Sequence, residues 1–324
     1  MSHDAVTARC AWLRDRVHGL PKQGALVQLS GGVDSSVVVH LCARALGPEH
    51  VTALYLPDTA TGPETRAYVD AAVASAGVRL VQRSIAAAIE AQQPMRDVVA
   101  ILQRYAPDYD PARDAYAVCA SPERARRLGA LVYDLAIGPR HGAPERIVRL
   151  RVEDLRALIA YQNRKQRTRM LFAYAEAEAN NLAVVGASNG DELRTGFVVK
   201  YGDDAADLLG IGDLTKSGVY ELARELGVPE QIIGRPPTTD TYALKQSQDD
   251  YYYYALPADV MGRLLELAPV GAAPIADDAP WEDLAAASGW AVAGLRQAAQ
   301  GLRASLHYQE TRSLRYHPGD GPLT

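Results

Sequence analysis

The stretch Leu29-Ser30-Gly31-Gly32-Val33-Asp34-Ser35-Ser36 decides how the rest of the chain can be interpreted. A short apolar run at 25–29 leads into it, and a longer apolar run at 37–46 follows it. The second run ends at a Gly-Pro pair at 47–48, which stops a helix. This order predicts a strand, a glycine-rich turn and a helix that follow one another directly.

The chemistry of the predicted turn suits an anion. Its two glycines let the backbone turn tightly and come close to a ligand, while the first N–H groups of the following helix favour negative charge. The hydroxyls of Ser30, Ser35 and Ser36 add hydrogen-bond donors, and Asp34 could hold a metal ion. A plain strand-turn-helix corner is the alternative, but the string Ser-Gly-Gly-x-Asp-Ser is more specific than a bare Gly-Gly turn. The stretch therefore predicts a pyrophosphate cradle.

The composition narrows the classes of function. The 324 residues include 34 basic and 39 acidic ones, and the net charge of −5 disfavours a broad nucleic-acid surface. The three cysteines form no Cys-x-x-Cys pair, which argues against a disulfide framework or a cysteine zinc site. The N-terminus lacks an apolar signal core, and no run approaches the ~20 apolar residues of a membrane span. We expect a cytoplasmic protein without nucleic-acid or membrane partners.

Strands and helices alternate along most of the chain. Further buried strands are expected at 51–56, 78–82 and 182–186, with helices at 64–76 and 152–180 between them. This alternation predicts an α/β fold with a doubly wound parallel sheet, whose ligands bind at the carboxyl ends of the strands. The loop after 182–186 should then face the same crevice as Ser30.

The domain organisation follows from the same pattern. We expect one domain over residues 1–324, with an inserted segment at about 92–150 and a C-terminal helical region at about 281–310. Prolines interrupt short helical pieces such as 97–105 and 123–135, so the insertion is predicted to be helical or rich in loops. A lid over the site and a plain structural insertion are both open interpretations.

Further motifs follow the glycine-rich turn in a fixed order. They are Asn163-x-x-x-Arg167-x-Arg169-Met170, Glu192, Lys200-Tyr201-Gly202-Asp203-x-x-x-Asp207, Asp213-Leu214-x-Lys216 and Pro236-Pro237-Thr238. With these motifs the chain resembles the ammonia-dependent NAD synthetases, a branch of the ATP pyrophosphatases. The resemblance implies the ATP pyrophosphatase fold, with ATP and Mg²⁺ as cofactors and a homodimer as the assembly.

The resemblance also implies a reaction. Such an enzyme is a ligase that forms a carbon–nitrogen bond: it adenylates a substrate carboxylate, releases pyrophosphate, and lets ammonia displace AMP. Deamido-NAD, which becomes NAD, is the default substrate. A different carboxylate of specialised metabolism is the first alternative, and a sulfur transferase or tRNA-modifying ATP pyrophosphatase is the second. A nucleotide-binding regulatory protein without catalysis is a third.

Roles carry over residue by residue from the resemblance. Asp34 and Glu192 would bind magnesium, while Lys216 would neutralise charge on the departing pyrophosphate. The residues expected to hold ATP phosphates are Ser30, Gly31, Gly32, Asp34, Ser35, Ser36, Lys216 and Thr238. The residues expected on the side of the carboxylate substrate are Asn163, Arg167, Lys200, Asp203 and Asp207. Asp203 and Asp207 are both candidates for accepting a proton from the attacking nitrogen, and with Asp34 and Lys216 they form the predicted catalytic set.

Several departures from the family pattern stand out. The insertion is larger than the family leads us to expect, and Asn189-Gly190-Asp191 differ from the usual residues there. Ala187 replaces a threonine, which removes one hydroxyl from the loop before Glu192, and Tyr308 stands in a region where cationic residues are usual. The predicted sheet begins within the first 30 residues, so we expect no fused glutaminase domain before it. Ammonia would therefore be free or come from a separate glutaminase partner.

Overall fold

A parallel sheet of five strands lies at the centre of the computed structural model, in the order β3-β2-β1-β7-β8. The structure describes residues 3–92, 94–121, 132–235, 242–245, 256, 258–267 and 280–300. The strands of this sheet are β1 (Gly24–Gln28), β2 (Val51–Tyr55), β3 (Arg79–Gln82), β7 (Leu182–Gly186) and β8 (Leu208–Leu209). All the pairings in it are parallel, which confirms the predicted α/β class.

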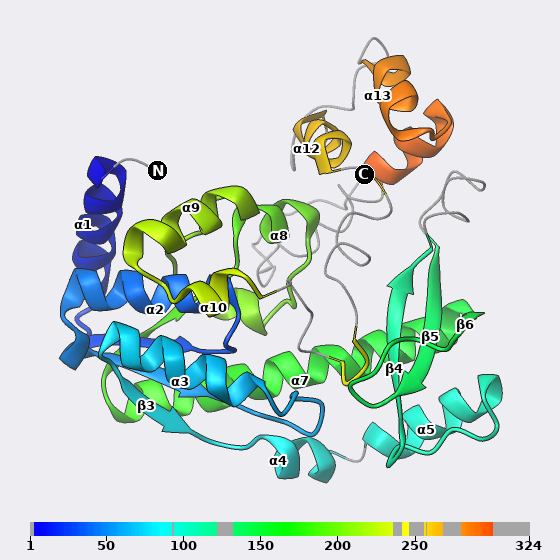
Figure 1. Cartoon of the computed structure of the whole chain (residues 1–324), viewed down its shortest axis with the longest axis horizontal. Coiled ribbons are helices and arrows are strands. Elements are labelled where there is room, and N and C mark those ends of the chain that lie inside the picture. The colour runs from blue at the N-terminus through cyan, green and yellow to red at the C-terminus, as the bar shows by residue number, and fades with distance from the viewer. Residues whose placement is uncertain are drawn as a thin grey trace, which may run out of the picture.

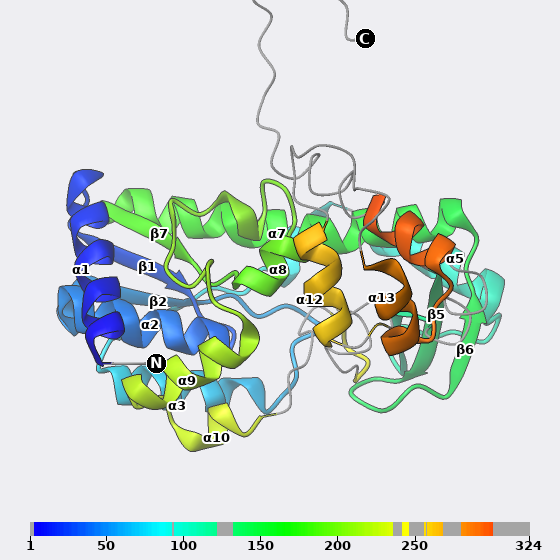
Figure 2. The ribbon, with the colours of Figure 1, turned by 90° about the horizontal axis from the view of Figure 1, so that it is seen from above.

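Helices cover both faces of the sheet, so the molecule has three layers there (Figures 1 and 2). On one face lie α1 (His3–Gly19), α2 (Val33–Leu46), α3 (Thr65–Ala76) and α9 (Lys216–Leu226). The long helix α7 (Val152–Ala179) covers the other face, and α4 (Ala86–Ala91) and α5 (Pro94–Tyr105) pack against α7. Short helical segments are η1 (Pro48–His50), α8 (Gly190–Thr195), η2 (Asp203–Ala205) and α10 (Glu230–Ile233).

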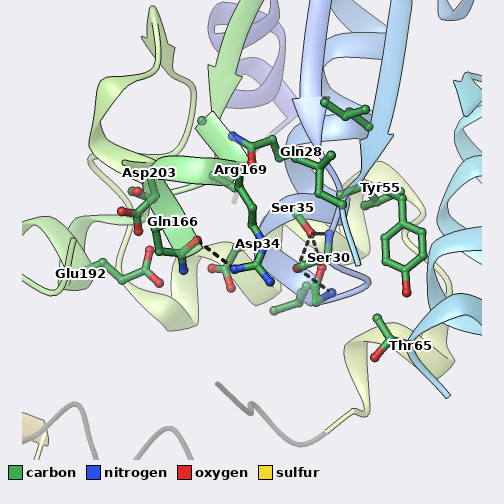
Figure 3. Close-up of a pocket in the computed structure, with 18 of the residues that line it drawn as sticks. Gln28, Ser30, Asp34, Ser35, Tyr55, Thr65, Gln166, Arg169, Glu192 and Asp203 are labelled. Atoms are coloured by element: carbon green, nitrogen blue, oxygen red, sulfur yellow. Dashed lines mark hydrogen bonds between the residues drawn. The ribbon is translucent and has the colours of Figure 1, made fainter. Parts of the chain in front are cut away.

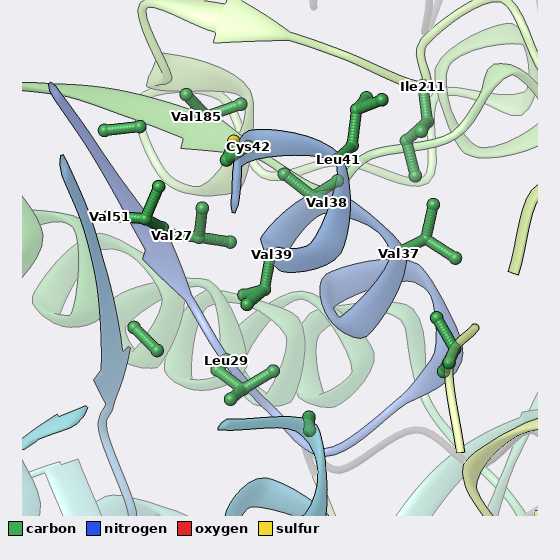
Figure 4. Packing of buried hydrophobic residues seen from close by; sticks show 14 of the residues in the cluster. Val27, Leu29, Val37, Val38, Val39, Leu41, Cys42, Val51, Val185 and Ile211 are labelled. Carbon is green, nitrogen blue, oxygen red and sulfur yellow. The ribbon is translucent and has the colours of Figure 1, made fainter. Parts of the chain in front are cut away.

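The sequence of the central strand explains this layering. Successive side chains of a strand point to opposite faces. Ala25 and Val27 of β1 therefore pack in the apolar cluster under α2, and Leu26 packs in the cluster under α7. All three are fully buried, as a continuous apolar strand in the middle of a parallel sheet should be. Figure 4 shows the first cluster, in which valines of α2 meet Val27, Val51 and Val185 of three strands.

The insertion contains an antiparallel sheet, with strand order β4-β5-β6. Its strands are β4 (Asp114–Ala120), β5 (Tyr133–Pro139) and β6 (Arg146–Arg149). The expected helix at 97–105 is present within α5, but the predicted helical character of the insertion is wrong where these strands form. Val118 of β4 faces Leu135 of β5, and both are fully buried in the cluster that also holds Leu158 of α7. Burial against α7 and α5 therefore outweighs any local helical preference.

The C-terminal part forms an apolar cluster of its own. It consists of α12 (Ala258–Leu267), α13 (Trp281–Ser288) and a helix at 292–300. Trp290 lies in this cluster and is only 2% exposed. The guanidinium of Arg296 lies 5.1 Å from the ring centroid of Trp281. The helical C-terminal region is thus observed up to residue 300. None of the described helices is long and apolar enough to span a membrane.

Candidate active site

The glycine-rich turn closes on itself through its serines. Ser30 Oγ and Ser35 Oγ lie 3.1 Å apart, and Ser30 Oγ also accepts a hydrogen bond from Gly32 N at 3.3 Å. Ser35 Oγ and Ser36 Oγ donate to the carbonyl of Gly32. Helix α2 then begins with no side-chain cap, which leaves its first N–H groups directed at the turn. The turn thus offers hydroxyl groups and helix N–H groups, the donors that suit the predicted anion cradle.

Gly31 is the residue in this turn that only glycine suits. Its φ is +76°, and a Cβ there would lie 3.0 Å from Tyr68 Cβ and 3.1 Å from the carbonyl oxygen of Thr65. Both conditions disfavour any side chain. Ser36 is fully buried beneath the turn, so its hydroxyl supports the backbone there. Neither Gly31 nor Ser36 lines the pocket described below.

Asp34, in the first turn of α2, meets side chains from two distant loops. Asn189 Nδ2 donates to Asp34 Oδ1 at 3.0 Å, and the ammonium of Lys216 donates to Asp34 Oδ2. Burial lowers the pKa of Lys216, but the carboxylates of Asp34 and Glu192 outweigh burial, so the pKa lies above its ordinary value. Lys216 is therefore charged: it donates to Asp34 and is also attracted by the carboxylate of Glu192, the two groups that the resemblance assigns to magnesium.

Glu192 is positioned by the start of α8. Asn189 caps this helix: its side-chain oxygen accepts from the backbone N–H groups of Asp191 and Glu192, each at 3.0 Å. Glu192 Oε2 in return accepts from Asn189 N at 2.8 Å, which completes a capping box. The carboxylate of Asp191 accepts from Lys216 N at 2.7 Å. One loop thus orients both Glu192 and the start of α9.

One pocket of about 280 Å³ lies next to these residues (Figure 3). It opens at the carboxyl ends of β1, β2 and β7, where the topology of the sheet predicts ligand binding. Ser30, Asp34 and Ser35 line it together with Glu192 and Lys216. Figure 3 shows Glu192 and Asp203 on one side of this turn, and Tyr55 and Thr65 on the other.

Asp203 and Asp207, between which the sequence does not decide, occupy different places. Asp203 lines the pocket, and its Oδ1 accepts from Val199 N at 2.7 Å. Burial raises the pKa of Asp203 to about 6, although this hydrogen bond opposes the rise. Asp207 instead accepts from Val184 N at 2.8 Å and from the hydroxyl of Tyr174 at 2.9 Å. It therefore ties the start of β8 to β7 and does not line the pocket.

The other predicted substrate residues also lie outside the pocket lining. Arg167 is exposed and donates from Nε to the carbonyl of Lys200 at 3.1 Å. Lys200 is buried, with its ammonium 5.5 Å from the ring centroid of Tyr201. Asn163 is half-buried on α7. Thr238, predicted to contact phosphate, lies outside the described residues, as does Tyr308.

Helix α7 instead presents Gln166 and Arg169 to the pocket. Arg169 Nη1 donates to Gln166 Oε1 at 3.4 Å, and Nη2 lies 3.2 Å from Asp58 Oδ2. Lys165 Nζ lies 3.5 Å from the same oxygen of Asp58, a carboxylate that is almost fully buried. Burial raises the pKa of Asp58, but the two cations and Ala60 N outweigh it and hold that pKa below its ordinary value.

Several lining residues were not found by sequence reasoning. Arg235 stacks its guanidinium 4.7 Å from the ring centroid of Tyr68 and donates to the carbonyl of Gly31 at 3.3 Å. Thr65 Oγ1 is buried at the pocket with no hydrogen-bond partner among the described residues. Arg169 belongs to the motif that begins at Asn163, and its i+3 spacing from Gln166 predicts that both lie on one face of a helix. No sequence motif around Thr65 or Arg235 indicates that either residue lines the pocket.

The donors present suit a hard divalent cation. Asp34 and Glu192 supply carboxylate oxygens at one pocket, and Mg²⁺ is typically bound through one or two carboxylates plus substrate phosphates and waters. No group of three or more His, Cys, Asp or Glu side chains that could hold a metal exists among the described residues. A nucleotide would therefore supply further ligands at this site.

Sequence comparisons indicate one family, and comparisons with solved structures show the fold. The profile described as NAD synthase matches residues 5–102 and 123–278. An NH₃-dependent NAD⁺ synthetase of Rhizobium meliloti (strain 1021) is 37% identical over 251 residues, which cover 78% of this chain and 74% of that protein. An NMN synthetase structure from Francisella tularensis matches with a TM-score of 0.60 at 20% identity, covering 98% of each chain. The structure of an NAD⁺ synthetase from Burkholderia pseudomallei matches with a TM-score of 0.51 at 22% identity, covering 93% of this chain and 89% of that one.

Proposed function

This chain belongs to the NAD synthase family, and from that membership we propose that it is a ligase that converts deamido-NAD to NAD with ATP and ammonia. The relative from Rhizobium meliloti, named for NH₃-dependent NAD⁺ synthesis, supports the reaction and the nitrogen donor. Family membership also favours amide synthesis over sulfur transfer. The observation that carries the proposal is one pocket that joins the anion cradle at Ser30 and Ser35 to the carboxylates of Asp34, Glu192 and Asp203.

The first step needs positive charge. A carboxylate oxygen of the substrate attacks the α-phosphorus of ATP, the bond to the β-phosphate oxygen breaks, and pyrophosphate leaves. The cradle and the start of α2 would bind the phosphates, because free N–H groups and hydroxyls converge there. Lys216 is already charged, and its ammonium group would stabilise the negative charge that develops on the departing pyrophosphate. Asp34 and Glu192 would hold Mg²⁺, which when bound neutralises phosphate charge.

The second step needs a proton acceptor. Ammonia attacks the acyl carbon of the adenylate, the bond to the AMP oxygen breaks, and the nitrogen must lose a proton. Asp203 suits this role better than Asp207, because Asp203 lines the pocket and its pKa is raised to about 6 by burial. Asp207 is occupied by two structural hydrogen bonds.

The assembly and location complete the proposal. We propose a homodimer, the assembly that the resemblance to the ammonia-dependent NAD synthetases implies. We place the enzyme in the cytoplasm, where ATP is available.

One assay tests the proposal. Purified protein is incubated with ATP, Mg²⁺, ammonium and deamido-NAD, and both pyrophosphate and NAD are measured. We expect equal amounts of the two products. Pyrophosphate release that requires another nicotinate nucleotide, with none for deamido-NAD, would replace the substrate and keep the adenylation chemistry. No pyrophosphate from a folded sample with any of these acids would contradict the proposal.

A further inference from the structure

We infer that Asn189 is a positioning residue that aligns the two proposed metal-binding carboxylates, Asp34 and Glu192, with each other. The inference rests on the proposed function, because it concerns the same ATP site. Asn189 was not a predicted site residue and does not line the pocket. It lies one layer behind the pocket, between α2 and α8.

The contacts of Asn189 reach both carboxylates. Its side-chain Nδ2 donates to Asp34 Oδ1 at 3.0 Å, and its backbone N donates to Glu192 Oε2 at 2.8 Å. Asp34 and Glu192 stand on helices more than 150 residues apart in sequence, so a link between them is tertiary. Asn189 bonds directly to both.

The orientation of the Asn189 amide is fixed. Its oxygen accepts from the backbone N–H groups of Asp191 and Glu192, so its nitrogen must face Asp34. The residue is only 2% exposed, which leaves its side chain little room to turn. Asn189 therefore presents a stationary donor to one oxygen of Asp34.

The two oxygens of Asp34 have partners of different kinds. Oδ1 is held by the buried Asn189, while Oδ2 is held by Lys216, whose long side chain can swing to a phosphate. If Lys216 moves to the nucleotide, Oδ2 becomes free for a cation and Oδ1 remains fixed. Asn189 then keeps the carboxylate in position while its other partner changes.

A purely structural role is the competing explanation, since Asn189 also caps α8. Serine separates the two roles. Asn189→Ser keeps an oxygen that can cap the helix, because serine is as good an N-cap as asparagine. It lacks the nitrogen that reaches Asp34. Asn189→Ala removes both functions.

The test measures metal binding without turnover. Mn²⁺, which is visible by electron paramagnetic resonance, is titrated into the full chain with α,β-methylene-ATP, which cannot be cleaved between the α and β phosphates. We expect Asn189→Ser and Asn189→Ala each to weaken Mn²⁺ binding about tenfold, as loss of a residue behind a metal ligand does. The melting temperature should fall for Asn189→Ala and stay close to that of the unmodified protein for Asn189→Ser.

Mn²⁺ binding by Asn189→Ser as tight as that of the unmodified chain would overturn the inference. If Asn189→Ala still bound Mn²⁺ more weakly, the helix cap, and not the contact with Asp34, would be the function of the residue. Failure of the unmodified chain to bind Mn²⁺ with the nucleotide would count against the proposed function itself. This result is obtained with the unmodified chain alone, so it can be distinguished from a failure of the inference about Asn189. The identity of the acid substrate does not affect this measurement.

Discussion

Asp34 is the residue on which the charges of the pocket converge. It faces one cation, Lys216, and one amide, Asn189, and it stands at the first turn of α2, where the helix terminus is positive. Replacement of Asp34 therefore changes both the proposed metal site and the environment of Lys216.

We predict that Asp34→Ala lowers the rate of pyrophosphate release by at least about 10²-fold, as the loss of a central electrostatic group does. The free energy of unfolding should change little, because the Asp34 side chain is partly exposed and Lys216 keeps the carboxylate of Glu192 as a counter-charge. The measurement is pyrophosphate release with ATP in excess, alongside a thermal melt. Turnover within a few-fold of the unmodified protein would contradict the assignment.

Asp203 gives a prediction in which activity and stability change in opposite directions. Its pKa is raised to about 6 in the folded chain by burial, above the ordinary 3.8. The protonated form is therefore favoured by folding, and that stability is lost as the pH rises through about 6. At neutral pH the buried carboxylate destabilises the fold by roughly 2–3 kcal/mol relative to a neutral isostere.

Asp203→Asn should consequently raise the melting temperature at pH 7.5, and most of the gain should disappear near pH 4.5. Amide formation should fall sharply, because asparagine accepts no proton. Melts at the two pH values and NAD formation at pH 7.5 check both parts. A variant that is less stable than the unmodified protein at pH 7.5 would refute the account of burial.

Sequence reasoning at this scale found residue types but not their directions. The sequence leaves both Asp203 and Asp207 as candidate proton acceptors. They lie four residues apart in an irregular segment, whose sequence does not determine where each side chain points. The short helix η2 and strand β8 direct Asp203 to the pocket and Asp207 to the backbone of β7. Asn189 was not among the predicted site residues, because its importance depends on a contact with Asp34 across the fold.

Helix α7 is the element that connects the sheet to the pocket. It carries Lys165 and Arg169 to the carboxylate of Asp58, which follows β2. The Asp58 carboxylate has a lowered pKa, so this pairing contributes stability above the ordinary carboxyl pKa and loses it on acidification. The same contact orients the guanidinium of Arg169 at the pocket.

Asp58→Asn is predicted to destabilise the protein by about 3 kcal/mol, because it leaves buried cations without their counter-charge. Asp70→Asn is the matched control: Asp70 pairs with Arg66 at 2.8 Å on the exposed surface of α3, and such a pair contributes at most about 1 kcal/mol. Urea unfolding of both variants at neutral pH gives the comparison. Equal destabilisation by the two changes would show that the buried cluster is not important for stability.

Apolar periodicity located the main elements well. The strands expected at 51–56, 78–82 and 182–186 are present within a residue at each end, and the helix expected at 152–180 is α7. The insertion was the failure, because β4 and β5 are short apolar runs that a local pattern cannot distinguish from buried helix. Their pairing depends on each other and on α7, which no local window contains.

At the scale of the whole molecule, the insertion and the parallel sheet share an apolar cluster. Leu135 of β5 packs in the cluster that contains Leu26 of β1 and Leu158 of α7. This arrangement supports the expectation of one domain, which stays a prediction until unfolding is measured. A shared cluster should make both parts unfold together.

Leu135→Ala should therefore lower the stability of the whole described core by about 2–5 kcal/mol, as removal of a buried leucine does. Ile147→Ala on β6 is the control, since Ile147 is 62% exposed. Calorimetry should give a single transition that Leu135→Ala shifts and Ile147→Ala leaves nearly unchanged. A separate early transition confined to Leu135→Ala would mean that the insertion is a unit of its own.

The positive φ and the crowded surroundings of Gly31 also limit which substitutions the gene tolerates at this codon. Every single-base change that replaces glycine introduces a Cβ, and at Gly31 that atom meets Tyr68 and the backbone of Thr65. Gly19, at the end of α1, has nothing within 4 Å of the same position. In a library selected for NAD formation, codon 31 should stay glycine while codon 19 diversifies. Gly31 is thus closed to substitution, and a change in the substrate of this enzyme has to come from other positions.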